Sequence, residues 1–211
     1  MKHQSINLTV LFDIVTDIIH EYNMSCRYYH TMDHVFAMFD KSILQHVKQK
    51  PHYVLAALYH DIVQLPFETD RNNIEHSIRK ARYDLVYRLG YTEEDFAIIQ
   101  RLIRMTDHNP FYAKPETMDE KLIKDADLAI LGSKPKTFEQ YEIDVRKEYL
   151  QHSDEKFRNG RIVLLNCFLL KKYIYSTSFF RKKYEKQARI NIRASIARLS
   201  QNVSRSNLRP N

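Results

Sequence analysis

Histidine and aspartate side chains in three separate segments of this sequence have the chemistry of metal ligands. His34 ends a Tyr-His-Thr-Met-Asp-His segment, and the doublet His60-Asp61 ends an apolar run. Asp127 follows later, in another apolar context. Burying an imidazole or a carboxylate without a partner is costly, and a divalent cation satisfies both. Two nitrogen and two oxygen ligands suit Mn, Mg, Fe, Co, Ni or Zn, so the sequence predicts one metal site with coordination positions left for water.

Each segment also has a simpler interpretation that needs no metal. His30 and His34 are four residues apart, so they share a helix face if the helix begins at or before His30, as a pair of partly exposed residues. The His-Asp doublet is then a hydrogen-bonded pair at a helix end. Asp125 competes with Asp127 as the third segment's ligand, and we expect Asp125 to face solvent. The metal interpretation is favoured because the three segments together supply a complete ligand set.

The elements that must position these ligands are helical by sequence pattern. Apolar residues recur at three- and four-residue steps, and no strand-like alternation competes with them. The sequence predicts an all-α bundle of eight or nine helices, in which facing helices supply the metal ligands. Expected helix starts, stops and spans are the first helix over residues 8–22, starts at Thr31, Pro51, Asp70, Thr92, Thr117, Thr137 and Ser153, stops at Gly90 and Gly132, and a last helix over residues 179–199.

The composition excludes several other classes of protein. Only 3 Gly occur in 211 residues, which rules out a Gly-rich phosphate loop and argues against an all-β fold. The 2 Cys are too few for a disulfide scaffold, and no membrane-span or signal-peptide pattern is visible. We therefore expect a cytoplasmic protein with no membrane partner. A single domain over residues 1–203, followed by a disordered tail over 204–211, is the expected organisation.

Positive charge is concentrated at the C-terminal end. Residues 181–211 contain nine Lys or Arg and one acidic residue, Glu185, whereas the rest of the chain is nearly balanced. A basic helix of this kind is either a solvated face or a surface for an anionic partner such as nucleic acid. Tyr184 is the one aromatic residue of this stretch, so no platform for stacking single strands is visible. Nucleic acid binding is therefore an alternative that the sequence does not favour.

The residues of the predicted metal site resemble the HD superfamily of metal-dependent phosphohydrolases, whose pattern H…HD…D falls here at His34, His60-Asp61 and Asp127. The chain resembles more closely a bacterial and phage family of predicted HD phosphohydrolases of unknown substrate. This resemblance covers most of the chain and reaches the last helix, so the basic helix is expected to belong to the fold. Its segments are Tyr29 to His34, His60-Asp61, Asn73-x-Glu75-x-Ser77, Thr106-x-His108, Asp125-x-Asp127-Leu128, Leu131-Gly132, Val145-Arg146-x-Glu148-Tyr149 and Ala188-Arg189-x-Asn191.

The first segment is also similar to the Tyr-His-Asn-x-x-His signature of cyclic-nucleotide phosphodiesterases, with Thr31 in place of Asn. This resemblance implies that His30 donates a proton to the leaving oxygen and that His34 binds the metal. Asp61 is expected to bind the metal and to orient the attacking water. Thr31 would lie behind the ligands, so the departure affects fine positioning rather than metal binding.

Several further residues take roles from the same resemblance. Glu75 is expected to orient a water or to bind a second cation, and His108 to support a ligand or to bind that second cation. Tyr29 is expected to line the pocket. Candidate donors for substrate phosphates, each otherwise an ordinary surface ion-pair residue, are Arg146, which is the first choice, Lys124, Arg27 and Arg71.

The resemblance implies hydrolysis of a phosphoester or phosphoanhydride bond in a nucleotide or another small phosphorylated substrate. One divalent ion, or two, would activate the attacking water. The first alternative is a metal-containing module of the same fold that senses a ligand without chemistry. His30 argues against it, because a sensor needs no proton donor. The second alternative is a nucleic-acid-binding protein that uses the basic helix. The sequence leaves homo-oligomer formation open.

Overall fold

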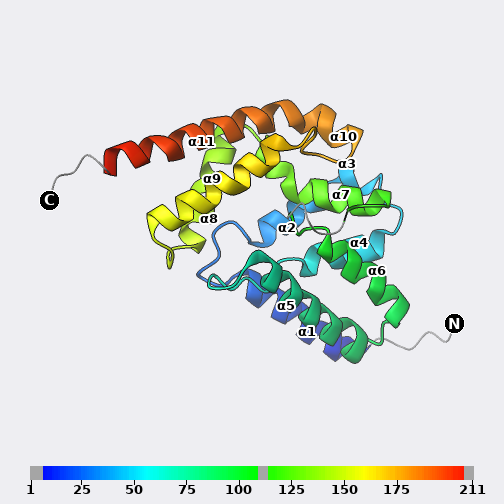
Figure 1. Cartoon of the computed structure of the whole chain (residues 1–211). Helices are drawn as coiled ribbons and strands as arrows, with labels where there is room; N and C mark the ends of the chain where they lie inside the picture. The colour runs from blue at the N-terminus through cyan, green and yellow to red at the C-terminus, as the bar shows by residue number, and fades with distance from the viewer. Residues whose placement is uncertain (1–6, 109–113, 207–211) are drawn as a thin grey trace. The chain divides into compact units, whose positions relative to one another are not determined.

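The structure is a computed structural model that describes residues 7–108 and 114–206, and every regular element in these ranges is a helix (Figure 1). Nine of the α-helices in these ranges have seven or more residues, which confirms the prediction of an all-α fold with eight or nine helices. The chain divides into two compact units, Met1–Asp127 and Leu128–Asn211. No helix in the described ranges combines the length and the apolar character needed to cross a membrane.

The core of the first unit lies where α4 packs against α6, with α2, α5 and α7 also in contact with α4. Tyr53 from α4 and Phe96, Ile99 and Ile103 from α6 are fully buried. The α6 residues recur at three- and four-residue steps, which places them on one face of that helix. The elements of this unit are α1 (Leu8–Tyr22), α2 (Met32–Met38), α3 (Lys41–Leu44), α4 (Lys50–Tyr59), α5 (Asp70–Arg82), the π-helix η1 (Tyr83–Arg88), α6 (Glu93–Arg104) and α7 (Met118–Asp127).

Local capping chemistry explains where several of these helices begin and end. The hydroxyl oxygens of Thr69, Thr92 and Thr117 accept backbone N–H groups in the first turns of α5, α6 and α7. Thr31 precedes α2 as expected, but its side chain makes no capping hydrogen bond. Gly90 follows η1 with φ of 75°, a conformation that glycine adopts without strain, and so ends the helix as predicted.

The second unit is also helical, and a glycine permits a close approach between two of its elements. A Cβ atom at Gly132 would lie 2.5 Å from Cβ of Tyr184 and 2.8 Å from its carbonyl oxygen, so only glycine fits there. Asn191 closes the same region, because its side-chain amide donates to the carbonyl oxygens of Leu131 and Ser133. The elements of this unit are the 3-10 helix η2 (Leu128–Gly132), α8 (Pro135–Glu148), α9 (Asp154–Leu170), α10 (Ser178–Phe180), the π-helix η3 (Arg181–Glu185) and α11 (Lys186–Ser206).

Two expected boundaries in this unit need correction. Helix α8 begins at Pro135 rather than at Thr137, because proline is pre-organised for the first helical turn. The last helical run extends from Ser178 to Ser206, beyond the expected span of 179–199. Residues 204–206, expected in the tail, are helical, and residues 207–211, the rest of the expected tail, lie outside the described ranges.

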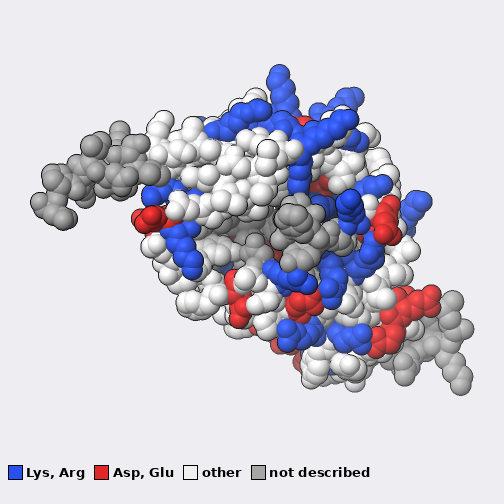
Figure 2. All heavy atoms as spheres, viewed as in Figure 1, with Lys and Arg blue, Asp and Glu red and all other residues white. Residues whose placement is uncertain are grey.

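Basic side chains of the second unit gather over α10, η3 and the start of α11 on the face drawn in Figure 2. Other basic side chains of this unit form hydrogen bonds and ion pairs within the unit. Arg189 donates to Glu185 and to the carbonyl oxygens of Leu169 and Lys171. Arg198 pairs with acidic residues of α8. The C-terminal helix thus uses part of its charge to hold its own unit together.

Candidate metal centre

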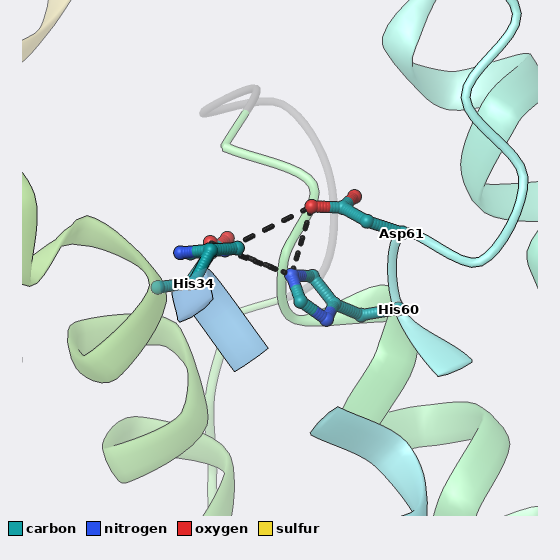
Figure 3. Close-up of side chains that lie close together, drawn as sticks. His34, His60 and Asp61 are labelled. Carbon is teal, nitrogen blue, oxygen red and sulfur yellow. Dashed lines mark hydrogen bonds and ion pairs between the residues drawn. The ribbon is translucent and has the colours of Figure 1, made fainter. Parts of the chain in front are cut away.

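Three helices of the first unit bring the predicted ligands together. His34 lies in the first turn of α2, His60 and Asp61 follow the last residue of α4, and Asp127 is the last residue of α7. These three helices contact one another pairwise. Figure 3 shows His34 directed toward His60 and Asp61 from the opposite side of the cluster. The candidate ligands therefore lie at the ends of three helices, and no helix is interrupted to bring them together.

The four side chains lie close enough together to hold one metal ion. One ligand atom from each of His34, His60, Asp61 and Asp127 lies within 4.8 Å of all the others. His34 Nε2 is 3.2 Å from His60 Nε2 and 3.1 Å from Asp127 Oδ1. His60 Nε2 is 2.9 Å from Asp61 Oδ2. Adjacent ligands about 2.1 Å from a metal in an octahedron are about 3.0 Å apart, so the three separations of 2.9–3.2 Å fit adjacent coordination positions.

The protonation of His60 supports a cation in this position. His60 Nδ1 lies 2.8 Å from the carbonyl oxygen of Ala57, which can only accept, so Nδ1 carries a proton. In a neutral imidazole, Nε2 then presents a lone pair, and it faces two carboxylates and a second imidazole nitrogen. Such an arrangement of acceptors is repulsive unless a proton or a metal ion lies among them. A hydrogen bond from Nδ1 to a carbonyl is also the usual way to orient a ligating histidine.

Charge–charge interactions within the cluster raise the pKa of its histidine His60 and lower the pKa values of its two carboxylates. Burial lowers the pKa of His60, but the carboxylates of Asp61 and Asp127 outweigh it and hold the pKa well above its usual value. Burial raises the pKa of Asp61, and the nearby His60 and His30 lower it to a net value well below the usual one. Burial also opposes ionisation of Asp127, whose pKa is nevertheless lowered by hydrogen bonds from His108 and His34. The cluster therefore stabilises positive charge among ionised carboxylates.

Two side chains behind the ligands fix their orientation. His108 Nε2 lies 2.8 Å from Asp127 Oδ2, the carboxylate oxygen opposite the one that faces His34. Tyr29 Oη lies 3.1 Å from His34 Nδ1. Tyr29, expected to line a pocket, thus contacts a ligand from behind. The His108 contact agrees with a supporting role, and the four-residue ligand cluster includes neither His108 nor Glu75.

The expected proton donor lies beside the cluster. His30 Nε2 is 3.9 Å from Asp61 Oδ2, and the side chains of His30 and Asp61 are 19% and 18% exposed. His34 and His60 are almost completely buried by comparison. The site is therefore open on the side of His30 and the carboxylates. Helix α2 begins only at Met32, so His30 precedes it, and its closeness to His34 does not arise from a shared helix face.

Arg27 and Tyr22 hold the backbone that carries the doublet. The Arg27 guanidinium donates to the carbonyl oxygens of His30, Asp61 and Ile62 at 3.0, 2.7 and 2.8 Å, and it lies over the Tyr22 ring. Tyr22 Oη donates to the carbonyl oxygen of Leu58. These bonds satisfy carbonyl groups at the end of α4 that lack helical partners. Arg27 was expected at the surface or on a substrate phosphate; it is instead buried against the main chain.

The loop after the doublet is fastened to α5 by the polar residues of the Asn-x-Glu-x-Ser segment. Asn73 exchanges two hydrogen bonds with the backbone of Leu65, and Ser77 does the same with Val63. Glu75, between them, is held by Arg104 through contacts of 2.8 and 3.1 Å. Asn73 and Ser77 thus support the site through the chain, and the catalytic role of Glu75 stays a prediction.

The sequence interpretation missed Asp84, a fully buried carboxylate in η1. Tyr59 Oη donates to Asp84 at 3.1 Å, and Lys80 and Arg88 pair with it at 2.8 and 3.3 Å. Because Tyr59 immediately precedes His60, this network anchors the end of α4 next to the candidate ligands. The signal was available in the sequence, since Lys80 and Arg88 lie four residues on either side of Asp84.

The remaining predicted residues have mixed outcomes. Asp125 is completely buried, so the expectation that it faces solvent is wrong. Lys124 is half-buried one turn before Asp127, and burial lowers its pKa. In the second unit, Arg146 bonds to Asp154 and to the carbonyl oxygens of the loop that follows α8. Substrate binding by Lys124 and Arg146 stays a prediction.

Comparison of this chain with known protein families, with curated proteins and with solved structures gives no match.

Proposed function

We propose that this protein is a metal-dependent phosphohydrolase of the HD type, acting on a nucleotide or another small phosphorylated molecule. The observation that carries the proposal is the convergence of two imidazole nitrogens and two carboxylate oxygens within 4.8 Å of one another. A second feature supports hydrolysis rather than metal storage, namely His30 beside the open edge of this cluster. A storage or sensing site has no use for a proton donor at that position.

The residues at the site divide the work of hydrolysis between them. His34, His60, Asp61 and Asp127 would hold a divalent cation, which supplies a Lewis acid and makes hydroxide available near neutral pH. His30 Nε2 lies 3.9 Å from the Asp61 carboxylate, at the edge of the cluster. From this position a protonated His30 would donate its proton to the leaving oxygen of the substrate.

The substrate is expected to approach along the open side of the site. His30, Asp61 and Asp127 keep side-chain exposures of 13–19%, whereas the ligating histidines are closed to solvent. A phosphate group there would also meet the half-buried Lys124, one helical turn before Asp127. Besides the cation, the ammonium group of Lys124 would be a second positive charge facing the substrate phosphate.

The experiment combines metal analysis with a phosphate-release screen. Purified protein is loaded in turn with Mn, Mg, Fe, Co, Ni and Zn, and it is offered nucleoside mono- and triphosphates, cyclic nucleotides and simple phosphoesters. We expect Asp61→Asn to lose both tight metal binding and turnover. We expect His30→Gln to retain the metal and to lose turnover by about 10²–10⁴-fold, the usual contribution of a positioned acid.

Two exposed residues of the same types provide matched controls. Asp33→Asn, next to His34 but exposed, and His20→Gln, exposed on α1, are expected to leave both metal content and rate unchanged. Full turnover in His30→Gln would remove the assigned acid. Metal binding without turnover on any phosphate compound would overturn the enzyme proposal in favour of a ligand-sensing module.

A further inference from the structure

A surface of the second unit gathers positive charge from two segments that are separate in the sequence. Lys171 and Lys172 follow α9, whereas Arg181, Lys182, Lys183 and Lys186 lie in η3 and at the start of α11; we call these six residues the basic patch. The guanidinium carbon of Arg181 lies 4.5 Å from the ring centroid of Tyr173, which joins the two segments directly. Figure 2 shows Lys and Arg side chains dense over this part of the chain.

Most of the charge in the basic patch is not neutralised by the protein. In the described part of the chain, no carboxylate lies within ion-pair distance of Lys172, Lys182, Lys183 or Lys186. The nearest acid in sequence, Glu185, accepts hydrogen bonds from Arg189 and from the backbone N–H groups of residues 174 and 175. Four ammonium groups without a carboxylate partner on one surface are the electrostatic signature of a surface for a polyanion.

Aromatic rings are interleaved with these cations. Arg181 is fixed over the Tyr173 ring because its Nε donates to the carbonyl oxygen of Thr177 at 3.2 Å. Lys172 approaches the same ring at 5.5 Å, and Lys183 lies 4.9 Å from the ring centroid of Tyr184. Arginine planes and aromatic rings held in this way are the groups on which unpaired bases stack. From residues 181–211 alone no stacking platform is expected; the structure adds Tyr173 from outside that stretch.

We propose that the basic patch binds single-stranded nucleic acid, with the lysines on the phosphate backbone and the Tyr173–Arg181 pair as a stacking surface for a base. Single strands are favoured over duplexes because only unpaired bases expose a face to stack. An anionic membrane fits less well, because a cation lies over the Tyr173 ring and would be drawn into the apolar layer with it. This binding is independent of the metal centre and does not require the proposed hydrolase activity.

The test measures fluorescence anisotropy of a labelled oligouridine longer than the roughly 4–16 nucleotides that such surfaces cover. The patch variant is Lys172→Glu/Lys183→Glu/Lys186→Glu. The control variant is Lys41→Glu/Lys50→Glu/Lys136→Glu, which changes net charge equally at three exposed lysines in the first turns of other helices. A Tyr173→Leu variant removes the ring alone, and Asp61→Asn tests independence from the metal centre. Circular dichroism confirms that each variant is folded, and Lys172→Gln/Lys183→Gln replaces the triple variant if that one is not.

We expect the wild-type protein to bind the oligonucleotide with an affinity that falls steeply between about 50 and 200 mM salt. The patch variant should bind at least about ten-fold more weakly, and its salt slope should be smaller by about 2, since each lost phosphate contact removes about 0.7. Tyr173→Leu should weaken binding. The control variant and Asp61→Asn should each bind the oligonucleotide with nearly the affinity of the wild-type protein.

Three outcomes would overturn the proposal. The first is no binding by the wild-type protein at low salt. The second is an equal loss in the patch and control variants, which would mean a response to net charge alone. The third is patch-dependent sedimentation with phosphatidylserine vesicles in the absence of oligonucleotide binding. Leu170, an exposed side chain beside the patch, is the residue that would enter such a membrane.

Discussion

The guanidinium group of Arg27 donates a 2.7 Å hydrogen bond to the main-chain oxygen of Asp61, across 34 residues of sequence. The same nitrogen also donates to the main-chain oxygen of His30. One buried side chain therefore fixes the separation between the segment of the expected proton donor and the segment of the metal ligands. Its hydrogen bonds in the described ranges go to main-chain oxygens, so it sets positions without contacting the candidate ligand side chains.

Replacing Arg27 by Met should loosen the metal centre. The change removes three charge-assisted hydrogen bonds and leaves the carbonyl groups at the end of α4 without partners, at a cost of about 2–4 kcal/mol. Metal affinity should fall by about 10–100-fold, as for other residues that orient ligands from behind. Thermal unfolding and titration calorimetry with Mn²⁺ measure the two effects. Arg193→Met, at an exposed position of α11, is the control and should change neither. Unchanged metal affinity in Arg27→Met would show that the backbone bonds do not set ligand geometry.

The stability of the metal-free protein should depend on pH in a way that a divalent ion removes. The pKa of His60 is raised on folding, so its contribution is present below its unfolded pKa of about 6.5 and is lost as pH rises through the folded pKa. The pKa values of Asp61 and Asp127 are lowered, so their contribution is present above about pH 4 and is lost as pH falls. The cluster should therefore stabilise the fold most between about pH 4 and 6.5.

A divalent ion takes the place of the proton on His60, so adding Mn²⁺ should restore stability above pH 6.5. Melting temperatures recorded against pH, with Mn²⁺ and with EDTA, test this directly. The two curves should separate above pH 6.5 and converge in acid, where protons compete with the metal for the ligands. Parallel curves across the whole range would mean that the metal does not bind at His60.

His108→Asn distinguishes two roles that the sequence leaves open. His108 contacts the Asp127 oxygen that points away from His34, so we expect the variant to keep one metal per chain with an affinity about 10–100-fold lower. If His108 instead ligates a second ion, the wild-type protein should hold two equivalents and the variant one. Metal content by elemental analysis at saturating metal separates the two cases. His46→Asn, at an exposed position, is the control.

Gly132→Ala should destabilise the second unit. The added methyl group would meet backbone and Cβ atoms of Tyr184 at 2.5–2.8 Å, and such atoms cannot move aside as a flexible side chain would. We expect a loss of about 1–3 kcal/mol, the usual cost of overpacking. Gly160→Ala gives the opposite sign, because nothing lies within 4 Å of its Cβ and alanine favours the helix by up to about 1 kcal/mol. Urea unfolding of both variants measures the difference, and equal effects would contradict the close contact.

The sequence was most informative where a single residue type decides the outcome. Threonine caps, prolines in first helical turns and the glycine after η1 mark helix boundaries through local chemistry, and the structure follows them at Thr92, Pro51 and Gly90. The four candidate ligands could be predicted because histidine and aspartate in apolar segments need a partner, and the structure brings one ligand atom of each within 4.8 Å of the others.

The residues that could not be predicted depend on contacts that leave no pattern in the sequence. Arg27 binds main-chain oxygens, which every residue possesses, so nothing in the sequence connects it to Asp61. Asp125 lies two residues from Asp127 and is also buried, because α7 is enclosed more completely than a single apolar stripe suggests. The basic patch needed the folded chain, since folding brings Arg181 over the ring of Tyr173.

Because the hydrogen bonds of Arg27 go to peptide oxygens, the backbone framework of the site is separable from the side chains that it carries. An exchange of His30 or Asp61 for another amino acid changes the side chain at the site and leaves the oxygens that Arg27 holds. The same backbone framework could therefore carry a different set of site side chains, through evolution or protein engineering, while its own hydrogen bonds stay unchanged.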